Sequence, residues 1–277
     1  MTCFFVSDLH GSAARYARLA ERIRAEQPEG VFLGGDLLAH GARGAAGDEF
    51  LEHELAPLLR QSRSDRTRVF VILGNDDPGT AERAVLAGER RGDWTYLHRR
   101  HVRWRGFDVF GYACVPPTPF LLKDWERYDV SRHVDPGCVS PEEGGRTVPV
   151  PEHDIRYGTI RADLDALAGG RDLSRALLLL HAPPYQTALD RAALDGKRVD
   201  HVQVDVHVGS VAVRRFIEAR QPMLALHGHV HESARLTGAW RDRLGRTVLL
   251  SAAHDGPELA LVRFDPEQPE QATRELL

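Results

Sequence analysis

The stretch Leu226-His227-Gly228-His229-Val230-His231-Glu232 decides how the rest of the chain is interpreted. It follows the short apolar run Pro222–Leu226, which predicts a buried strand with a proline at its head. Side chains two residues apart in an extended backbone point to the same side, so His229 and His231 are expected to face one point. Gly228 lets the backbone turn sharply there. Two imidazoles at a strand end favour a transition-metal site, although the pattern alone could arise by chance in a chain with 14 histidines.

Four further apolar segments read as strands, and each is followed by polar side chains of the types that bind metals. The segments are Cys3–Val6, Val31–Leu33, Val69–Leu73 and Ala176–Leu180. The residues that follow them are Asp8, His10, Asp36, Asn75 and His181. Ligands of α/β sheets gather beyond the carboxyl ends of the strands, which is where all these residues are expected. With His229 and His231 the set mixes oxygen and nitrogen donors, which suits Mn, Fe, Zn or Co better than Ca or Mg alone.

Helical patterns alternate with these strands. Helices are expected from about Ser12 to before Pro28, from an N-cap at Asp48 through Leu59, from Thr159 to Leu167, and from Ser210 to about Ala219. Strands that are apolar throughout, alternating with helices, indicate an α/β fold whose sheet is covered by helices. No linker divides the chain, so residues 1–277 are expected to form a single domain.

The segment from Cys114 to about Tyr157 contains seven prolines and shows little regular structure. A long irregular segment within a compact domain is usually a lid, a binding loop or disorder. Its aromatic residues Phe120, Trp125 and Tyr128 argue against disorder. We therefore expect an insertion at 114–157 that acts as a lid over the site and sets specificity.

Composition limits the classes of partner and compartment. A net charge of -4 gives no overall attraction to nucleic acid or an anionic membrane, and no apolar run is long enough to span a bilayer. The three cysteines form no CxxC pair, and Cys3 to Ser7 already reads as a core strand rather than part of a signal peptide, so a cytoplasmic protein is expected. The one concentrated basic stretch, His98–Arg105, could contact nucleic acid, but a charged edge strand is the commoner explanation.

Five motifs together resemble the calcineurin-like metallophosphoesterases. They are Asp8-x-His10, Gly35-Asp36, Gly74-Asn75, His181 and Gly228-His229-x-His231, in the order and spacing of that family. Three further features resemble the branch of predicted phosphoesterases related to bacterial cyclic-nucleotide phosphodiesterases. These are Pro117-x-Pro119, Asp124-Trp125-Glu126 and Gly209-Ser210.

The resemblance implies a four-layer α/β/β/α sandwich with two divalent transition-metal ions at the strand ends, with manganese the first choice in vitro. By this resemblance Asp8, His10 and His231 hold one ion. Asn75, His181 and His229 hold the other, and Asp36 bridges both. Such ion pairs lie about 3.5–4 Å apart and acidify a bound water, which becomes the nucleophile.

Four residues are predicted to take part in catalysis: Asn75, which is also a ligand, Asp76, Asp77 and His207. In the commonest form of the family a histidine follows Asn75 and protonates the leaving group, whereas this chain has Asp76 there. Asp77 matches the usual acidic residue of the family, but Asp77-Pro78 is also typical of a helix start. His207, just before a predicted helix start, could help hold phosphate, with a solvated strand face as the alternative.

The function these features predict is hydrolysis of a phosphodiester, and less readily of a monoester, by hydroxide held at two metal ions. The substrate is expected to be a small phosphate ester or a nucleotide-like molecule. The alternatives are a weakly active metal-binding scaffold, which the missing histidine favours, and a nuclease, which only the basic stretch favours. The sequence does not predict the oligomeric state.

Overall fold

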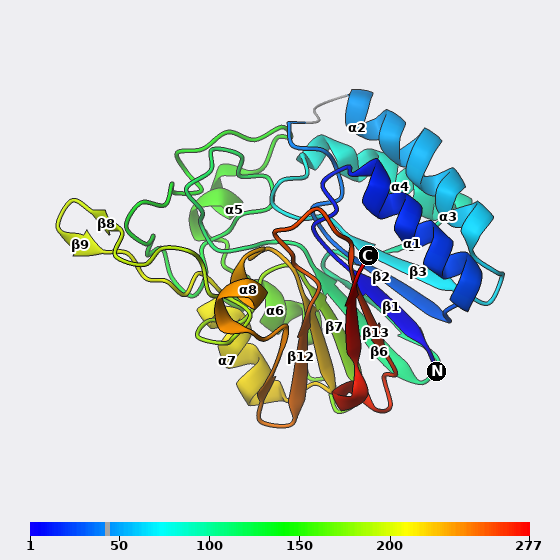
Figure 1. Cartoon of the computed structure of the whole chain (residues 1–277). Helices are drawn as coiled ribbons and strands as arrows, with labels where there is room; N and C mark the ends of the chain where they lie inside the picture. The colour runs from blue at the N-terminus through cyan, green and yellow to red at the C-terminus, as the bar shows by residue number, and fades with distance from the viewer. Residues whose placement is uncertain (42–44) are drawn as a thin grey trace.

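The computed structural model describes residues 1–41 and 45–277. Two six-stranded sheets lie between two groups of helices, with α1, α3 and α4 outside the first sheet and α6 and α7 outside the second (Figure 1). The predicted four-layer α/β/β/α arrangement is thereby confirmed. None of the helices in the two described ranges combines the length and the apolar character that crossing a bilayer requires.

The first sheet carries the N-terminal strands, in the order β14-β13-β1-β2-β3-β4. Strands β1 to β4 are parallel, whereas β13 runs antiparallel to both β1 and β14. Their bounds are β1 (Cys3–Val6), β2 (Gly30–Gly34), β3 (Arg68–Ile72), β4 (Thr95–Tyr96), β13 (Ala260–Phe264) and β14 (Thr273–Leu276).

The second sheet has the order β11-β12-β10-β7-β6-β5. Its four inner strands are parallel and its two edge strands are antiparallel to their neighbours. The bounds are β5 (Arg100–Trp104), β6 (Phe107–Tyr112), β7 (Ala176–Leu180), β10 (Leu224–His227), β11 (Arg241–Leu244) and β12 (Thr247–Ser251). A small hairpin, β8 (Arg198–Val199) and β9 (Val202–Gln203), stands apart from both sheets (Figure 1).

Three of the longer helices, α1, α6 and α7, begin where the sequence places a capping hydroxyl. Ser12, Thr159 and Ser210 each accept a hydrogen bond from the backbone three residues on. The helices are α1 (Ala13–Glu26), α2 (Ala45–Glu49), α3 (Ala56–Ser62), α4 (Glu82–Arg91), α5 (Glu152–Tyr157), α6 (Ile160–Ala168), α7 (Val211–Arg220) and α8 (Ser233–Thr237).

The predicted N-cap at Asp48 is wrong. Asp48 lies within α2, which continues through a π-helical turn (Phe50–Leu55) into α3. The Asp48 carboxylate instead accepts a hydrogen bond from Arg83 of α4 at 2.7 Å. A tertiary partner, absent from the local pattern, therefore decides the role of this side chain.

Aromatic side chains fill the space beside the strands of both sheets. Phe32 and Phe70 stack at 4.8 Å between ring centroids, and Trp104 of the second sheet meets the edge of each ring. All three side chains are buried. Because such contacts tie the sheets together, they fix how the strand ends of one sheet face those of the other.

The basic stretch His98–Arg105 forms the edge strand β5 and its flanks, as the commoner explanation predicted. Each of its four arginines is paired with a carboxylate. The pairs are Arg99–Asp163, Arg100–Glu89, Arg103–Asp108 and Arg105–Glu29. Most of the positive charge of the stretch is thus balanced within the protein.

The segment 114–157 has little regular structure before α5, which forms its last six residues. Buried polar contacts hold the irregular part in place. Lys123 and Glu126 are both buried and lie 2.5 Å apart. The Asp124 carboxylate accepts from the backbone of Gly79, in the loop after β3, at 2.7 Å. The segment therefore contacts the loop that carries Asn75, and its role as a lid stays a prediction.

Asp129 anchors the same segment to the N-terminus of α7. Its carboxylate accepts from the Ser210 hydroxyl at 2.5 Å and from the backbone amides of Val211 at 2.7 Å and Ala212 at 3.2 Å. A carboxylate at this position satisfies helix amides that have no partner within the helix and interacts favourably with the helix dipole.

Asp129→Ala is expected to lower the free energy of unfolding by about 1–2 kcal/mol, because the helix amides lose their acceptor. Urea unfolding followed by circular dichroism measures the change. Asp135→Ala, which removes an exposed carboxylate of the same segment, is the matched control and should leave the midpoint unchanged. Equal midpoints for Asp129→Ala and the control would contradict the anchoring role.

Candidate metal centre

The seven predicted ligands lie together where the parallel strands of both sheets end. Asp8 and His10 follow β1, Asp36 follows β2, Asn75 follows β3, His181 follows β7, and His229 and His231 follow β10. Parallel strands end at the same edge of a sheet, and the two sheets face one another, so one rim of the sandwich collects all seven. Four of the seven side chains thus come from the first sheet and three from the second.

A first group of four side chains has the spacing of a metal site. One ligand atom from each of Asp8, His10, Asp36 and His231 lies within 4.8 Å of the others. The Nε2 atoms of His10 and His231 are 3.2 Å apart, and His231 Nε2 is 3.4 Å from Asp8 Oδ1. Four donor atoms at these separations can surround one ion at the usual ligand distance of about 2.0–2.2 Å.

A second group shares Asp36 with the first. His181 Nε2 lies 3.2 Å from Asp36 Oδ2 and 3.1 Å from Asn75 Oδ1. The Nδ1 of His181 lies 2.8 Å from the carbonyl of Gly34, which as an acceptor fixes the proton on Nδ1 and turns Nε2 toward the group. The His229 ring packs beside His181 with centroids 5.3 Å apart.

The backbone at these strand ends is unusual. Asp8, His10, Asp36 and His229 all have positive φ, at 57°, 46°, 52° and 74°. Left-handed backbone is uncommon for residues with a side chain, and its clustering is typical of functional sites. Gly228 is needed beside them because a Cβ there would overlap Ser7 and crowd Asp8.

Burial and charge set the protonation of the group. Burial opposes ionisation of Asp8, but its hydrogen bond to His231 and the nearby histidines outweigh it and hold the pKa of Asp8 below its usual value. Burial likewise opposes a charge on His181, but Asp36 and Asp8 raise its pKa to about 10. Burial lowers the pKa of His10 to about 4 and that of His229 to about 3, which favours the neutral ligating form.

The residues present fit a pair of divalent transition-metal ions. The donors are carboxylate, amide and imidazole, and Asp36 reaches both groups. The buried Nδ1 of His10 has no hydrogen-bond partner among the described residues. A proton on that nitrogen leaves Nε2, which faces the first group, free to bind an ion.

Asp76 lies at the mouth of the site beside His40. Asp76 Oδ2 is 3.0 Å from His40 Nδ1 and 3.7 Å from His10 Nδ1, and the rings of His10 and His40 stack at 4.2 Å. The predicted catalytic role of Asp76 stays a prediction.

The suggestion that Asp77 caps a helix is wrong. The helix α4 begins only at Glu82, and its N-cap position is Ala81. The Asp77 carboxylate has no exposed surface and accepts from the backbone amides of Leu38 at 2.8 Å, Gly74 at 2.9 Å and Leu37 at 3.0 Å. Asp77 therefore joins the loops after β2 and β3, and its predicted catalytic role stays a prediction.

The sequence predicts that His207 could help hold phosphate at the N-terminus of α7. Its Nδ1 lies 2.8 Å from Asp190 Oδ1, and the amides at the start of α7 are occupied by Asp129. Within the described ranges, His207 belongs neither to the group of Asp8, His10, Asp36 and His231 nor to a second cluster of His10, His40 and Asp76. The catalytic role predicted for His207 stays a prediction.

Arg15 is a contributor that the sequence did not reveal. Its guanidinium donates to the carbonyl oxygen of Asp8 at 2.7 Å and also contacts the carbonyl of Gly256. It thereby ties the strained backbone at Asp8 to a distant loop. No motif marks an arginine on α1 for such a role.

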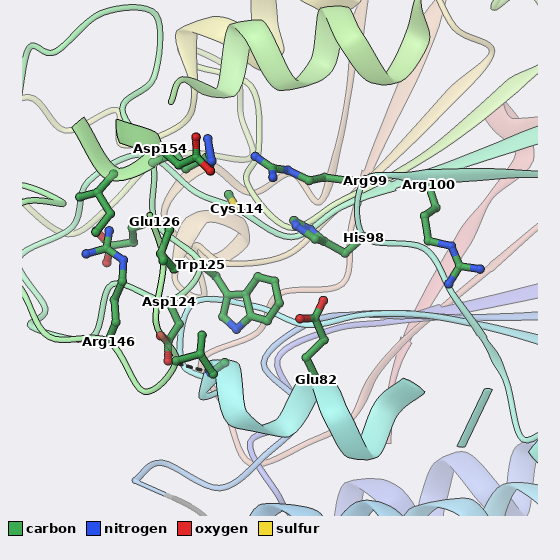
Figure 2. A pocket seen from close by; sticks show the side chains of 15 residues that line it. Glu82, His98, Arg99, Arg100, Cys114, Asp124, Trp125, Glu126, Arg146 and Asp154 are labelled. Carbon is green, nitrogen blue, oxygen red and sulfur yellow. Dashed lines mark hydrogen bonds between the residues drawn. The ribbon is translucent and has the colours of Figure 1, made fainter. Parts of the chain in front are cut away.

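A cavity of about 450 Å³ opens beside the site rather than in it. Figure 2 shows Trp125, Glu82, His98 and Arg146 around it, and none of the seven predicted ligands lines it. A second cavity of about 660 Å³ shares Gly79 with the first. Both cavities therefore adjoin Gly79, which follows β3, and none of the seven predicted ligands lines either of them.

Most of the chain matches one protein family. Residues 1–233 match the family described as "Calcineurin-like phosphoesterase". An uncharacterized protein of Methanocaldococcus jannaschii is 32% identical over 83 residues. This alignment spans 29% of the present chain and only about a third, 32%, of that protein's length.

Solved structures with the same fold cover almost the whole chain. A protein of Thermus thermophilus has a TM-score of 0.62 and 15% identity, over 99% of this chain and 98% of its own. A dimetal phosphatase from Danio rerio has a TM-score of 0.58 and 15% identity, over 95% and 91%. At such identities the likeness shows a shared fold.

Proposed function

Because the chain belongs to the calcineurin-like phosphoesterase family, we propose that it is a phosphodiesterase that requires two divalent metal ions. One observation carries the proposal: Asp36 lies at the centre of two adjoining groups of ligand atoms. The substrate would be a small phosphate ester or a nucleotide-like molecule.

The ligands divide into two sets around Asp36. Asp8, His10 and His231 would hold one ion, and Asn75, His181 and His229 would hold the other. Only a carboxylate has two anionic oxygens with which to contact two cations, and Asp36 is the carboxylate adjacent to both sets. Asn75 ligates through a neutral oxygen, so the pair of ions keeps more positive charge than a further carboxylate would leave.

When bound, two divalent ions supply Lewis acidity toward the phosphoryl oxygens and a water of lowered pKa. The protein's own contribution is orientation. The carbonyl of Gly34 holds the His181 ring, and the backbone amide of His229 donates to Asp8 Oδ1 at 3.0 Å. Because Asp8 and His181 are buried and held by these partners, the ligand geometry exists before substrate arrives, which lowers the reorganisation needed during reaction.

Charge at the mouth of the site favours a diester over a monoester. Two divalent ions outweigh Asp8 and Asp36 by two positive charges, and an ionised Asp76 at the mouth reduces that excess to one. The Asp76 carboxylate opposes the second negative charge of a dianionic monoester, which a monoanionic diester lacks. One extra unit charge about 10 Å from a carboxylate, at an effective dielectric near 20, costs about 1.7 kcal/mol.

Hydrolysis of bis(p-nitrophenyl) phosphate and p-nitrophenyl phosphate, side by side with Mn(II), tests the proposal. We expect kcat/KM to be about tenfold higher or more for the diester, as that energy difference implies. Protein stripped with a chelator should lose activity and regain it with Mn(II), Co(II) or Zn(II). Activity that survives metal removal would overturn the metal requirement, and a preference for the monoester would overturn the diesterase assignment.

A further inference from the structure

Asp76 contacts predicted ligands of both metal sets without belonging to either. It follows Asn75 in the loop after β3 and keeps 24% of its side chain exposed. Its backbone amide donates to Asp36 Oδ1 at 2.8 Å. Its two carboxylate oxygens face different neighbours.

Asp76 fixes the orientation of the side-chain amide of Asn75, a predicted ligand of the second set. Asn75 Nδ2 donates to Asp76 Oδ1 at 3.2 Å. An ionised carboxylate only accepts hydrogen bonds, so the amide must turn its nitrogen to Asp76 and its oxygen the other way. That oxygen, Asn75 Oδ1, lies 3.1 Å from His181 Nε2, on the side where an ion would bind.

Toward the first set, Asp76 stands next to a nitrogen that lacks a partner. The buried Nδ1 of His10 makes no hydrogen bond to any residue in the described ranges, and Asp76 Oδ2 is 3.7 Å away. The other ring nitrogen, Nε2, faces His231. Ligation through Nε2 requires the proton on Nδ1, and a carboxylate beside Nδ1 stabilises that tautomer and the ring orientation.

We propose that Asp76 is a positioning residue that orients one ligand of each metal set, Asn75 through Oδ1 and His10 through Oδ2. This inference rests on the ligand assignment of the proposed function. It also explains why a carboxylate suits this chain here. A neutral imidazole has one acceptor nitrogen and cannot serve Asn75, His10 and His40 together, whereas a carboxylate has about four acceptor positions.

Calorimetric titration of the metal-free protein with Mn(II) tests the inference. Wild type should bind two ions, and Asp76→Ala should weaken binding at both positions by about 10–100-fold, the usual effect of losing a partner that orients a ligand. Asp76→Asn has the same shape and keeps one acceptor oxygen, so it should restore part of the affinity at one position. Asp172→Ala, which removes an exposed carboxylate that accepts hydrogen bonds from Ser174, is the matched control and should bind as wild type does.

A second readout does not depend on bound metal. Long-range proton–nitrogen NMR of the metal-free protein reports the tautomer of each histidine, and the His10 signals are identified by their loss in His10→Gln. We expect His10 to carry its proton on Nδ1 in wild type and to become a mixture of tautomers in Asp76→Ala. A role limited to packing would leave this ratio unchanged.

The outcomes separate this inference from the proposed function. Two bound ions in wild type, with unchanged affinities and unchanged His10 tautomer in both Asp76 variants, would overturn the positioning role and leave the metal centre intact. A wild-type protein that binds no Mn(II) would overturn the proposed function itself. If Asp76→Ala does not fold, Asp76→Asn alone decides, by the same two measurements.

Discussion

Asp36→Asn is expected to reduce kcat/KM for a phosphodiester by about 10³-fold or more and to weaken Mn(II) binding at both positions. The substitution keeps the shape of the side chain but replaces one anionic oxygen by an NH₂ donor, which cannot contact a cation. Losing a shared ligand removes several kcal/mol of stabilisation of the reacting phosphoryl group, which corresponds to that change in rate. Steady-state kinetics and calorimetric titration measure the two effects.

A matched control is Asp172→Asn, the same change at an exposed carboxylate that precedes β7, at the end of that strand opposite to His181. It should retain wild-type turnover and two bound ions. Full activity in Asp36→Asn would show that Asp36 does not bridge two ions, and the division of ligands around it would then be wrong.

Lys123→Ala is expected to lower the free energy of unfolding by about 3–5 kcal/mol at pH 8. Lys123 has no exposed surface, Glu126 is 2% exposed, and their charged atoms lie 2.5 Å apart. Removing one member of a buried ion pair leaves the other charge buried without compensation. Denaturant unfolding of wild type and variant gives the difference directly.

The pH dependence of that loss has a definite sign. Burial raises the pKa of Glu126 to about 7, against the opposing effect of Lys123. Since the pKa in the folded state is above the unfolded value, stability falls as pH rises from about 4.5 through the folded pKa. Without Lys123 the folded pKa rises further, so the deficit of Lys123→Ala should be larger at pH 8 than at pH 5.

A double variant distinguishes the ion pair from simple packing. Lys123→Met with Glu126→Gln removes both charges and keeps the approximate volume, and such replacements are often neutral. It should recover most of the stability lost in Lys123→Ala. A loss below about 1 kcal/mol in the single variant, or no recovery in the double variant, would contradict the assigned role of the pair.

The strand ends could be predicted from sequence because each is a local event. A short apolar run followed by Asp8, Asp36 or His181 gives both the strand and the position of the polar side chain, and parallel pairing then gathers these ends on one rim. The grouping of side chains from two sheets follows from that arrangement without any knowledge of loop conformation.

Roles that depend on distant partners could not be predicted in this way. Asp48 and Asp77 both sit in patterns typical of helix starts, yet the first pairs with Arg83 and the second joins two loops. Asp129 lies in an irregular segment with no capping pattern and still caps α7, 82 residues further on. A carboxylate is drawn to whichever amides lack partners, and only the folded chain decides which these are.

The left-handed backbone at Asp8, His10, Asp36 and His229 sets function against stability. Such a conformation costs of order 1–3 kcal/mol at a residue with a side chain, and a glycine would relieve it without moving the chain. A glycine, however, brings no ligand atom. Selection for stability alone would therefore favour glycine at these four positions. The side chains of the candidate metal centre are retained only under selection for its function.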